Sequence, residues 1–270
     1  MNQSTKSTKS TRPTISTTST PATKRIDKII LEFFPHLNLT RNKVQELINN
    51  GLVYYRGKCV ERASTPIIDI INEKSQIEIL DHHHFVGRGA KKIQRAIEYF
   101  ELKDELQGSV IADIGAGTGG FTDYLLSIGV AKAYTIDVGH GQLDPKLLAN
   151  PKVINFEGIS IKDISVDMID GLVDLAVADL SFISITKVLK NIFSLVKENG
   201  KVIVLFKPQF EVGKNNLNKK GIVKNINLVE TSLREFKTWC KENNYNVMGD
   251  IISPIRGKEG NLEYLIYFKR

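Results

Sequence analysis

Along residues 93–270, short runs of apolar residues alternate with segments in which apolar residues recur every three or four positions. The first pattern predicts strands and the second predicts helices, so the two kinds of element should alternate. Short apolar runs predict strands near 109–114, 132–137, 152–156, 172–178, 201–207, 246–252 and 262–268. Apolar stripes at helical spacing predict helices near 92–102, 119–128, 183–198 and 227–243. This order predicts an α/β fold, with a mostly parallel, seven-stranded sheet covered on both faces. Only residues 253–261 join the last two strands, so we expect them to form an antiparallel pair at the sheet edge.

A smaller α+β unit is predicted over residues 25–81. Isoleucines and phenylalanines between residues 26 and 34 recur at helical spacing, and Thr40 can cap a second helix that ends at Gly51. Residues 52–60 read as a hairpin about the turn Arg56-Gly57-Lys58, and residues 77–80 as a further strand. Residues 82–92 are interpreted as a linker to the domain at 93–270. Its three adjacent histidines, residues 82–84, do not share one face of a regular element, which argues against a metal site.

Residues 1–24 are rich in Ser, Thr and Lys and contain no acidic residue. They lack the apolar side chains needed for a core, so we predict a disordered basic leader. The segment has no apolar stretch of the kind found in secretory signals, and no run in the chain approaches the roughly 18 apolar residues of a membrane helix. Two distant cysteines, Cys59 and Cys240, are consistent with a reducing compartment. A cytoplasmic location is expected, with an organellar one as the alternative if the leader is a transit peptide.

The net charge of +7 is confined to the first third of the chain. Residues 1–92 hold 15 Lys and Arg against 8 Asp and Glu, whereas residues 93–270 hold 22 of each. A basic module joined to a neutral domain favours a polyanionic partner, with nucleic acid as the first candidate. A basic tail that only aids solubility is the alternative.

A glycine turn in residues 111–123 is the main chemical signature. The sequence IADIGAGTGGFTD reads as a buried strand, a sharp turn and the start of a helix, with Asp113 just before the glycines. A pyrophosphate would bind the N–H groups of such a helix start, and the Asp113 carboxylate would repel it. The amine and sulfonium of S-adenosylmethionine would instead be attracted, so a methyl donor is favoured. The literal match to G-x-G-x-x-G leaves a nicotinamide-dependent oxidoreductase as an alternative.

Further acidic residues follow the next strands. Asp137 lies about 20 residues beyond the glycine turn, where a carboxylate can bind both ribose hydroxyls of a nucleoside. Asp163 could lie beside the adenine or could equally cap a helix. The predicted cofactor-binding residues are Asp113, Gly115, Gly117, Gly119, Gly120, Phe121, Asp137 and Asp163.

Lys207 ends an apolar run, residues 202–206, and Asp179 follows the preceding strand. A lysine at a partly desolvated strand end can act as a base, although a structural lysine that extends to solvent fits that position as well. Both residues should lie at the crevice of the sheet, because the carboxyl ends of parallel strands meet at one edge.

Residues 39–58 resemble an S4 RNA-binding domain, through LTRNKVQELI, GLV and RGK. The strings DIGAGTGGFTD, DVGHGQLD, ADLSFIS, KPQFEVGK and SPIRGKEGNLEY resemble the TlyA family from about residue 25 to 267. This hemolysin A-like family pairs an S4 domain with an FtsJ-like, Rossmann-like methyltransferase domain. The resemblance implies S-adenosylmethionine-dependent methylation of a ribose 2′-hydroxyl of ribosomal RNA, with cytidine as the expected target, free or within ribosomal subunits.

Residue roles follow from the same resemblance. FtsJ-like enzymes use a Lys-Asp-Lys-Glu tetrad, which corresponds to Lys92, Asp179, Lys207 and Glu263. Lys92 is preferred to Lys91 by its spacing from Arg88. The predicted RNA-binding residues are Arg41, Lys43, Arg56, Lys58 and Arg88. No metal is expected. A non-enzymatic cytolysin or RNA-binding factor remains a third hypothesis, and the sequence leaves the target nucleotide and the oligomeric state open.

Overall fold

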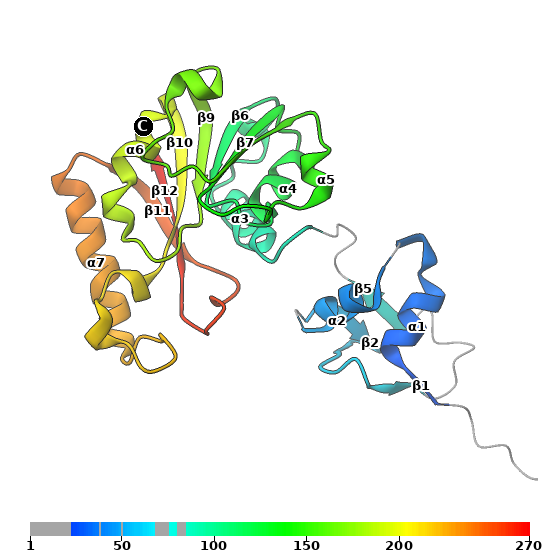
Figure 1. Cartoon of the computed structure of the whole chain (residues 1–270). Helices are drawn as coiled ribbons and strands as arrows, with labels where there is room; N and C mark the ends of the chain where they lie inside the picture. The colour runs from blue at the N-terminus through cyan, green and yellow to red at the C-terminus, as the bar shows by residue number, and fades with distance from the viewer. Residues whose placement is uncertain (1–22, 38, 50, 68–75, 80–84) are drawn as a thin grey trace, which may run out of the picture. The chain divides into compact units, whose positions relative to one another are not determined.

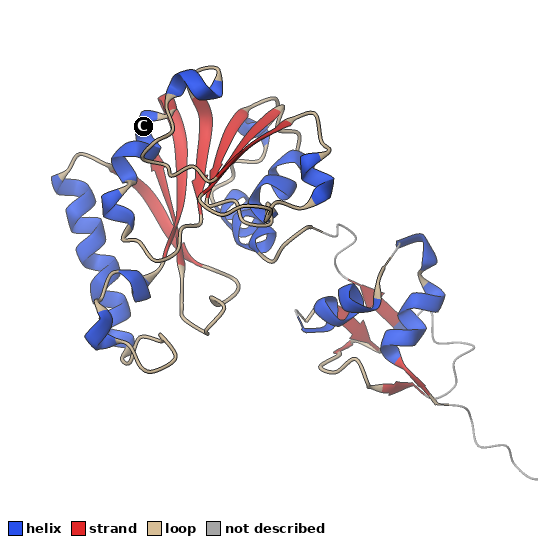
Figure 2. Cartoon of the chain, in the orientation of Figure 1, coloured by secondary structure: helices blue, strands red, loops and turns tan. Residues whose placement is uncertain are grey.

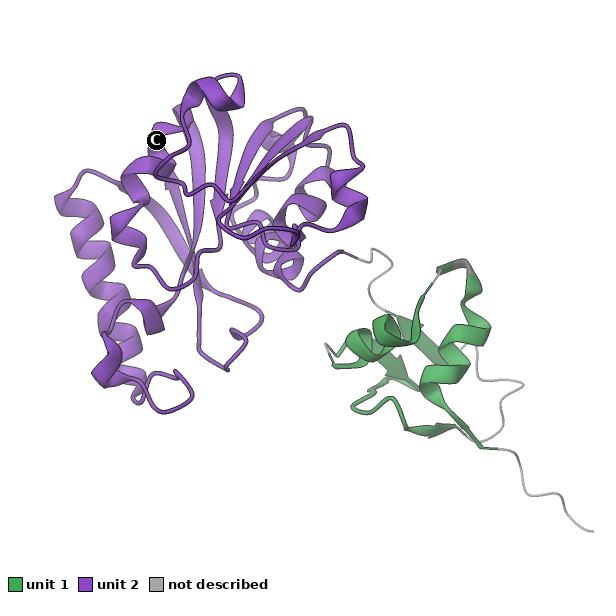
Figure 3. Ribbon diagram, in the orientation of Figure 1, with its two compact units in different colours: residues 1–84 green, residues 85–270 purple. Residues whose placement is uncertain are grey.

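The chain divides into two compact units, Met1–His84 and Phe85–Arg270 (Figure 3). The computed structural model describes residues 23–37, 39–49, 51–67, 76–79 and 85–270. All but the last two residues of the predicted leader, and the three histidines at 82–84, lie outside the described residues.

The N-terminal unit combines two short helices with a three-stranded and a two-stranded antiparallel sheet (Figure 1). Its elements are β1 (Lys24–Arg25), α1 (Ile26–Phe33), η1 (Pro35–Leu37), α2 (Arg41–Asn49), β2 (Val53–Tyr55), β3 (Lys58–Cys59), β4 (Pro66–Ile67) and β5 (Ile77–Ile79). Strand β2 lies between β3 and β5, and β1 pairs with β4. The apolar stripes of both helices, including Ile29 and Leu47, are buried together in one core with Val53.

The hairpin between β2 and β3 turns at Arg56 and Gly57, which have φ values of 51° and 71°. Two successive left-handed residues give a tight turn whose twist matches that of the flanking strands. The turn exposes Arg56 and Lys58 at one end of the unit.

The C-terminal unit is a doubly wound α/β sheet (Figure 2). Its helices are α3 (Gly89–Tyr99), α4 (Gly120–Ser127), α5 (Pro145–Leu148), α6 (Leu189–Ser194) and α7 (Ile226–Glu242). Its strands are β6 (Val110–Ile114), β7 (Lys132–Asp137), β8 (Val153–Glu157), β9 (Val173–Ala178), β10 (Val196–Phe206), β11 (Asn246–Ile252) and β12 (Tyr264–Lys269). Short 3-10 helices are η4 (Asp104–Leu106), η5 (Val166–Ile169), η6 (Ile185–Lys187), η7 (Pro208–Phe210) and η8 (Lys214–Asn216).

The seven strands lie in the order β11-β12-β10-β9-β6-β7-β8. Strands β10, β9, β6, β7 and β8 are parallel, and β12 runs antiparallel to both of its neighbours. The predicted seven-stranded, mostly parallel sheet is therefore confirmed. Alternate strand residues are buried on opposite faces, in one core beneath α3 and α4 and in a second beneath α6 and α7 (Figure 1).

Two predicted helix boundaries are wrong. The helix expected over 183–198 consists of η6 and α6 only, because Val196 pairs in parallel with Val173 and so belongs to β10. The helix expected from 92 begins at Gly89, since Ala90 extends the buried stripe of α3 by one turn. Lys92 is therefore the fourth residue of α3 and not the first residue of the helix.

Candidate active site

The four residues of the predicted tetrad converge at the carboxyl edge of the sheet. Asp179 follows β9 and Lys207 follows β10, and these strands are parallel. Glu263 immediately precedes β12, which runs in the opposite direction, so the start of β12 lies at the same edge. The last strand is predicted over 262–268 and begins at Tyr264, so Glu263 lies one residue before the strand and not within it. Lys92 reaches this edge from the N-terminal part of α3.

Lys92 joins the two carboxylates. Its Nζ lies 2.8 Å from Oε2 of Glu263 and 3.4 Å from Oδ2 of Asp179. Glu263 is 3% exposed and Lys92 is 8% exposed, so little solvent screens this contact. A buried ion that lost its partner would be costly, and each group therefore fixes the position of the other.

Lys207 forms the second half of the site. Its Nζ lies 2.6 Å from Oδ1 of Asp179 and donates a hydrogen bond of 3.0 Å to Oγ of Ser181. The same Nζ lies 5.8 Å from the ring centre of Phe210, within the range of a cation–π contact. Asp179 thus bridges two lysines, one through each carboxylate oxygen. In the chain Glu263–Lys92–Asp179–Lys207, carboxyl groups and amines therefore alternate.

The glycine turn touches the backbone of Asp179. The Asp179 N–H donates to the carbonyl of Ile114 at 3.0 Å. Gly115 has a φ of 76°, and a Cβ added there would lie 2.6 Å from the Asp179 carbonyl oxygen. A larger residue would be strained and would push Asp179 away, so glycine at this position allows the tetrad and the turn to be adjacent.

Asp113 is buried beneath the turn. Its Oδ2 accepts hydrogen bonds from the backbone N–H and the hydroxyl of Thr122 at 3.0 and 2.7 Å, while its Oδ1 has no hydrogen-bond partner among the described residues. Burial, together with the charges of Asp179 and Asp137, raises the pKa of Asp113 to about 7, and the Thr122 hydrogen bonds only partly oppose this shift. The carboxyl group is thus poised to gain a positively charged neighbour.

Asp137 binds the other side of the turn. Its Oδ2 accepts from the N–H of Gly117 at 2.8 Å and its Oδ1 from the N–H of Gly139 at 2.7 Å. The nearest atom to a Cβ added at Gly117 would be Oε1 of Gln142, 4.0 Å away, so this part of the turn faces open space. Asp163 lies exposed in a turn after β8.

The remaining predicted cofactor residues mainly pack the turn against the protein. Gly119 precedes α4, and a Cβ there would clash with Leu147. Gly120 approaches the backbone of Ala90. Phe121 is 3% exposed and belongs to the core beneath α3, so its side chain holds the two helices together.

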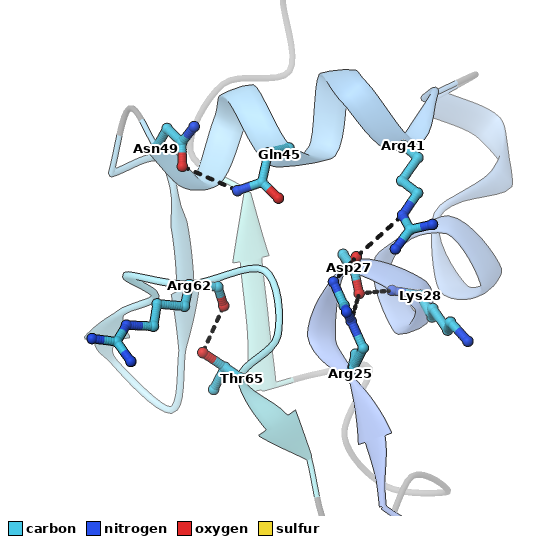
Figure 4. Close-up of polar contacts among 8 residues, drawn as sticks. All are labelled: Arg25, Asp27, Lys28, Arg41, Gln45, Asn49, Arg62 and Thr65. Carbon is cyan, nitrogen blue, oxygen red and sulfur yellow. Dashed lines mark hydrogen bonds and ion pairs between the residues drawn. The ribbon is translucent and has the colours of Figure 1, made fainter.

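The predicted RNA-binding residues are divided between the units. Arg41 begins α2 and is exposed (Figure 4), and Lys43 pairs with Glu46 at 3.1 Å. The Arg56 guanidinium lies 5.3 Å from the ring centre of Tyr55, and Lys58 is exposed in β3. Arg88 is exposed at the start of α3 in the C-terminal unit.

Several aromatic and polar residues around Lys207 are not among the predicted site residues. Phe182 is 92% exposed, has a φ of 64° and lies with its ring centre 5.4 Å from that of Phe210. Glu211 accepts hydrogen bonds from Ser184 Oγ at 2.7 Å and from the N–H of Ile185 at 3.0 Å. Phe182 and Ser184 lie in the string ADLSFIS, and Phe210 and Glu211 in KPQFEVGK. The two strings are expected to meet at the crevice, but nothing in the sequence pairs these particular side chains.

Chemically, the arrangement suits deprotonation and positioning of a hydroxyl group. An amine held between a carboxylate and a hydroxyl can orient or accept a proton, and an aromatic surface beside it can bind a planar group.

Comparison with known proteins agrees with this interpretation. The sequence profile of FtsJ-like methyltransferases matches residues 85–270. Hemolysin A of Brachyspira hyodysenteriae is 36% identical over 85% of this chain and 93% of its own length. A 16S/23S rRNA (cytidine-2′-O)-methyltransferase of Mycobacterium tuberculosis is 34% identical over 85% of this chain and 84% of its own length. A solved hemolysin-like structure from Streptococcus thermophilus, 28% identical, aligns with a TM-score of 0.67 over 93% of this chain and 90% of that chain.

Proposed function

The chain belongs to the FtsJ-like methyltransferase family, and we propose that it transfers a methyl group from S-adenosylmethionine to a ribose 2′-hydroxyl of ribosomal RNA. The observation that carries the proposal is the buried Glu263–Lys92–Asp179–Lys207 chain in contact with the glycine turn. A cytidine is the proposed target, since the related mycobacterial enzyme is named for that nucleotide.

The residues at the glycine turn fit S-adenosylmethionine. Asp113 offers a buried carboxylate oxygen without a partner, which suits a cationic ligand better than an anionic one. Gly117 leaves open space where a ligand can approach the backbone, and Asp137 lies beside it at the end of β7. When bound, the cofactor supplies an electrophilic methyl group on a positively charged sulfur.

Lys207 is proposed to act on the attacking hydroxyl. A ribose hydroxyl is a poor nucleophile at neutral pH, and an amine at hydrogen-bond distance can take its proton or stabilise the developing negative charge. Asp179 and Ser181 hold the Lys207 amine from two sides. Lys92 and Glu263 in turn fix Asp179, so the base is positioned before substrate arrives.

Phe182 is proposed to contact the target nucleotide. A phenylalanine that is 92% exposed loses hydrophobic stabilisation unless a partner covers it. Its ring lies over Phe210, next to Lys207, and nucleobases of single-stranded or unpaired RNA stack on aromatic side chains. A base on Phe182 would bring its ribose towards the amine.

Ribosomal RNA, free or in subunits, is the proposed partner, and the cytoplasm is the proposed location. The basic first third of the chain supports a polyanionic partner, and the N-terminal unit is proposed to be the S4 RNA-binding domain that its sequence resembles. Across the part of the chain that the structure describes, no helix has the length and apolar character to cross a membrane. Neither the oxidoreductase nor the cytolysin hypothesis is favoured by the family match or by the site.

The test is Lys207→Ala in a methyl-transfer assay with labelled S-adenosylmethionine and ribosomal RNA. Transfer should fall by roughly 100-fold or more, the range typical of general base loss, while RNA and cofactor binding persist. Lys201→Ala is the matched control, because Lys201 lies in the middle of β10, opposite the last residue of β12, and pairs with Glu105. Undiminished transfer by the Lys207 variant would refute the proposed role. Mapping of ribose methylation in ribosomal RNA from cells with and without the gene would identify the nucleotide.

A further inference from the structure

The side chain of Asn261, which is 5% exposed, connects two loops of the C-terminal unit. Its Oδ1 accepts a hydrogen bond from the N–H of Val223 at 3.0 Å, and its Nδ2 donates to the carbonyl of Gly221 at 3.0 Å. These partners precede Asn261 by 38 and 40 residues along the chain. Figure 1 shows the two loops, one before α7 and one between β11 and β12, beyond the same end of the sheet. Both polar atoms of one buried amide therefore bind the backbone of a distant loop.

The first loop is a short hairpin, residues 217–224, which we call the lysine hairpin. Leu217 and Val223 form an isolated antiparallel bridge. Oδ1 of Asn218 accepts hydrogen bonds from two backbone N–H groups within the hairpin, at 2.8 and 3.0 Å. The hairpin is thus held from inside by Asn218 and from outside by Asn261.

The lysine hairpin is a positively charged part of a unit whose total charge is balanced. Residues 212–229 contain no acidic residue. Three of the lysines in the hairpin are exposed, namely Lys219, Lys220 and Lys224. A local excess of positive charge beside an active site favours contact with the backbone of a nucleic acid substrate.

The second loop determines where Glu263 lies. The carbonyl of Asn261 accepts from the N–H of Gly257 at 3.0 Å, and Glu263 follows two residues later. A Cβ added at Gly257 would lie 2.5 Å from Oε1 of Glu263, so the backbone of the turn packs directly against this carboxylate. The other oxygen, Oε2, pairs with Lys92 at 2.8 Å. A displacement of the turn would therefore move the carboxylate relative to Lys92.

We propose that Asn261 is a positioning residue for methyl transfer, which fixes Glu263 against Lys92 and connects it to the lysine hairpin, the surface for the RNA backbone next to the target ribose. A buried amide that lost its partners would be costly, so the two loops are stable only in their joint arrangement. A shift of Glu263 passes along the chain of ion pairs to the amine of Lys207. This inference rests on the proposed methylation of RNA and adds a residue that touches none of the reacting atoms.

Three single substitutions separate the two ends of this connection. Asn218→Ala removes the internal hydrogen bonds of the lysine hairpin and leaves the contacts of Asn261 in place. Gly257→Ala introduces a Cβ against Glu263 and leaves the hairpin unchanged. Asn261→Ala releases both loops. The full-length protein is used in each case.

Single-turnover methyl transfer over a range of ribosomal RNA concentrations gives the rate constant at saturation and the RNA concentration at half-saturation. Asn218→Ala should raise the half-saturating concentration by about threefold to tenfold and keep the rate constant within about twofold, because only phosphate contacts are weakened. Gly257→Ala should lower the rate constant by roughly tenfold or more and leave half-saturation within about twofold, because only the tetrad is displaced. Asn261→Ala should show both changes.

Amide hydrogen exchange followed by mass spectrometry tests the connection without RNA. Asn261→Ala should speed exchange in peptides from residues 217–224 and also from residues 253–263, where the N–H groups of Ser253 and Gly257 are bonded to carbonyls. Asn218→Ala should speed exchange in the first set only. Peptides from β6 and β9, which lie in the middle of the sheet, should stay protected in every variant and so show that the fold is intact.

The inference is overturned if Asn261→Ala keeps the rate constant of the unmodified protein at saturating RNA, or if it leaves exchange in residues 253–263 unchanged. It is also overturned if Asn218→Ala lowers the rate constant as much as Asn261→Ala does, since a loose hairpin would then explain the whole effect. If the unmodified chain transferred no methyl group to ribosomal RNA, the proposed function would fail. The exchange data alone would then decide whether Asn261 holds the turn that carries Glu263.

Discussion

At the residue scale, the proposed cofactor site contains one buried carboxyl group, Asp113, whose protonation depends on pH near neutrality. Its pKa is raised to about 7, above the ordinary value of 3.8, mainly because burial disfavours the charged form. A group whose pKa is higher in the folded state stabilises the fold most at pH below 3.8, and this contribution is lost as the pH rises through about 7. The full cost above pH 7 is on the order of 4 kcal/mol. A cation beside the unpartnered Oδ1 would offset it.

We predict that Asp113→Asn flattens this pH dependence in the protein without cofactor. The asparagine cannot ionise, so the variant avoids the stability that the unmodified protein loses as Asp113 ionises. Between pH 4 and pH 8 the free energy of unfolding of the variant should therefore rise by several kcal/mol relative to that of the unmodified protein. Urea unfolding of both proteins at a series of pH values measures this difference. The contributions of all other titrating groups are the same in both proteins and are removed by the subtraction. The same variant should bind S-adenosylmethionine more weakly. A constant difference across the pH range would contradict the assignment.

The tetrad residues and their convergence at one crevice could be predicted from motifs and strand ends, whereas the geometry of their contacts could not. Lys91 and Lys92 are adjacent and chemically identical in sequence, and the helical stripe of α3 decides which of them is buried. Lys92 makes the ion pairs with Glu263 and Asp179, 171 and 87 residues away along the chain. Contacts between residues so far apart in the chain depend on how the whole sheet folds. No local sequence pattern specifies their geometry.

At the scale of elements, the loop after β9 is the least regular part of the site. It contains Phe182 in a left-handed conformation, which is uncommon for a bulky side chain, and Ser184 is extended with a ψ of 135°. Glu211, just after η7, binds the start of η6 through Ser184 and Ile185. This contact explains part of the failed helix prediction over 183–198, because a carboxylate from a distant segment caps the chain at Ile185.

We predict that Glu211 holds the loop after β9 and the loop after β10 in their relative positions. Glu211→Ala should lower the rate constant for methyl transfer by roughly 10- to 100-fold, because small displacements of Asp179 and Ser181 misplace the Lys207 amine. Glu211→Gln retains an acceptor for Ile185 and should keep most of the activity. The rate constant for methyl transfer is measured for both variants in single-turnover experiments at saturating RNA and cofactor. Equal activity of the alanine variant and the unmodified protein would show that the contact is dispensable.

At the scale of the whole molecule, charge and chemistry are divided between the two units. All predicted cofactor and tetrad residues lie in the C-terminal unit, whose sheet is buried on both faces by its own helices. The net charge lies in residues 1–92. Alternating periodicity predicted the α/β fold correctly because each strand and helix of this unit buries a distinct face. In the N-terminal unit the hairpin of β2 and β3 and the strand β5 could be predicted, whereas β1 and β4, of two residues each, carry too little pattern to be placed from the sequence.

This division predicts that a fragment of residues 82–270 retains cofactor binding and loses most RNA affinity. The fragment keeps both large cores, the glycine turn and the hydrogen bond from the Val86 N–H to Asp123, so it should fold and bind S-adenosylmethionine within about threefold of the full chain. It lacks the basic N-terminal unit, and RNA affinity at moderate salt should fall by 100-fold or more, since phosphate contacts dominate such affinities. Calorimetry with the cofactor and filter binding with ribosomal RNA measure the two properties. If the fragment bound RNA as tightly as the full chain, the substrate interface would have to lie on the neutral domain, and the N-terminal unit would need another role.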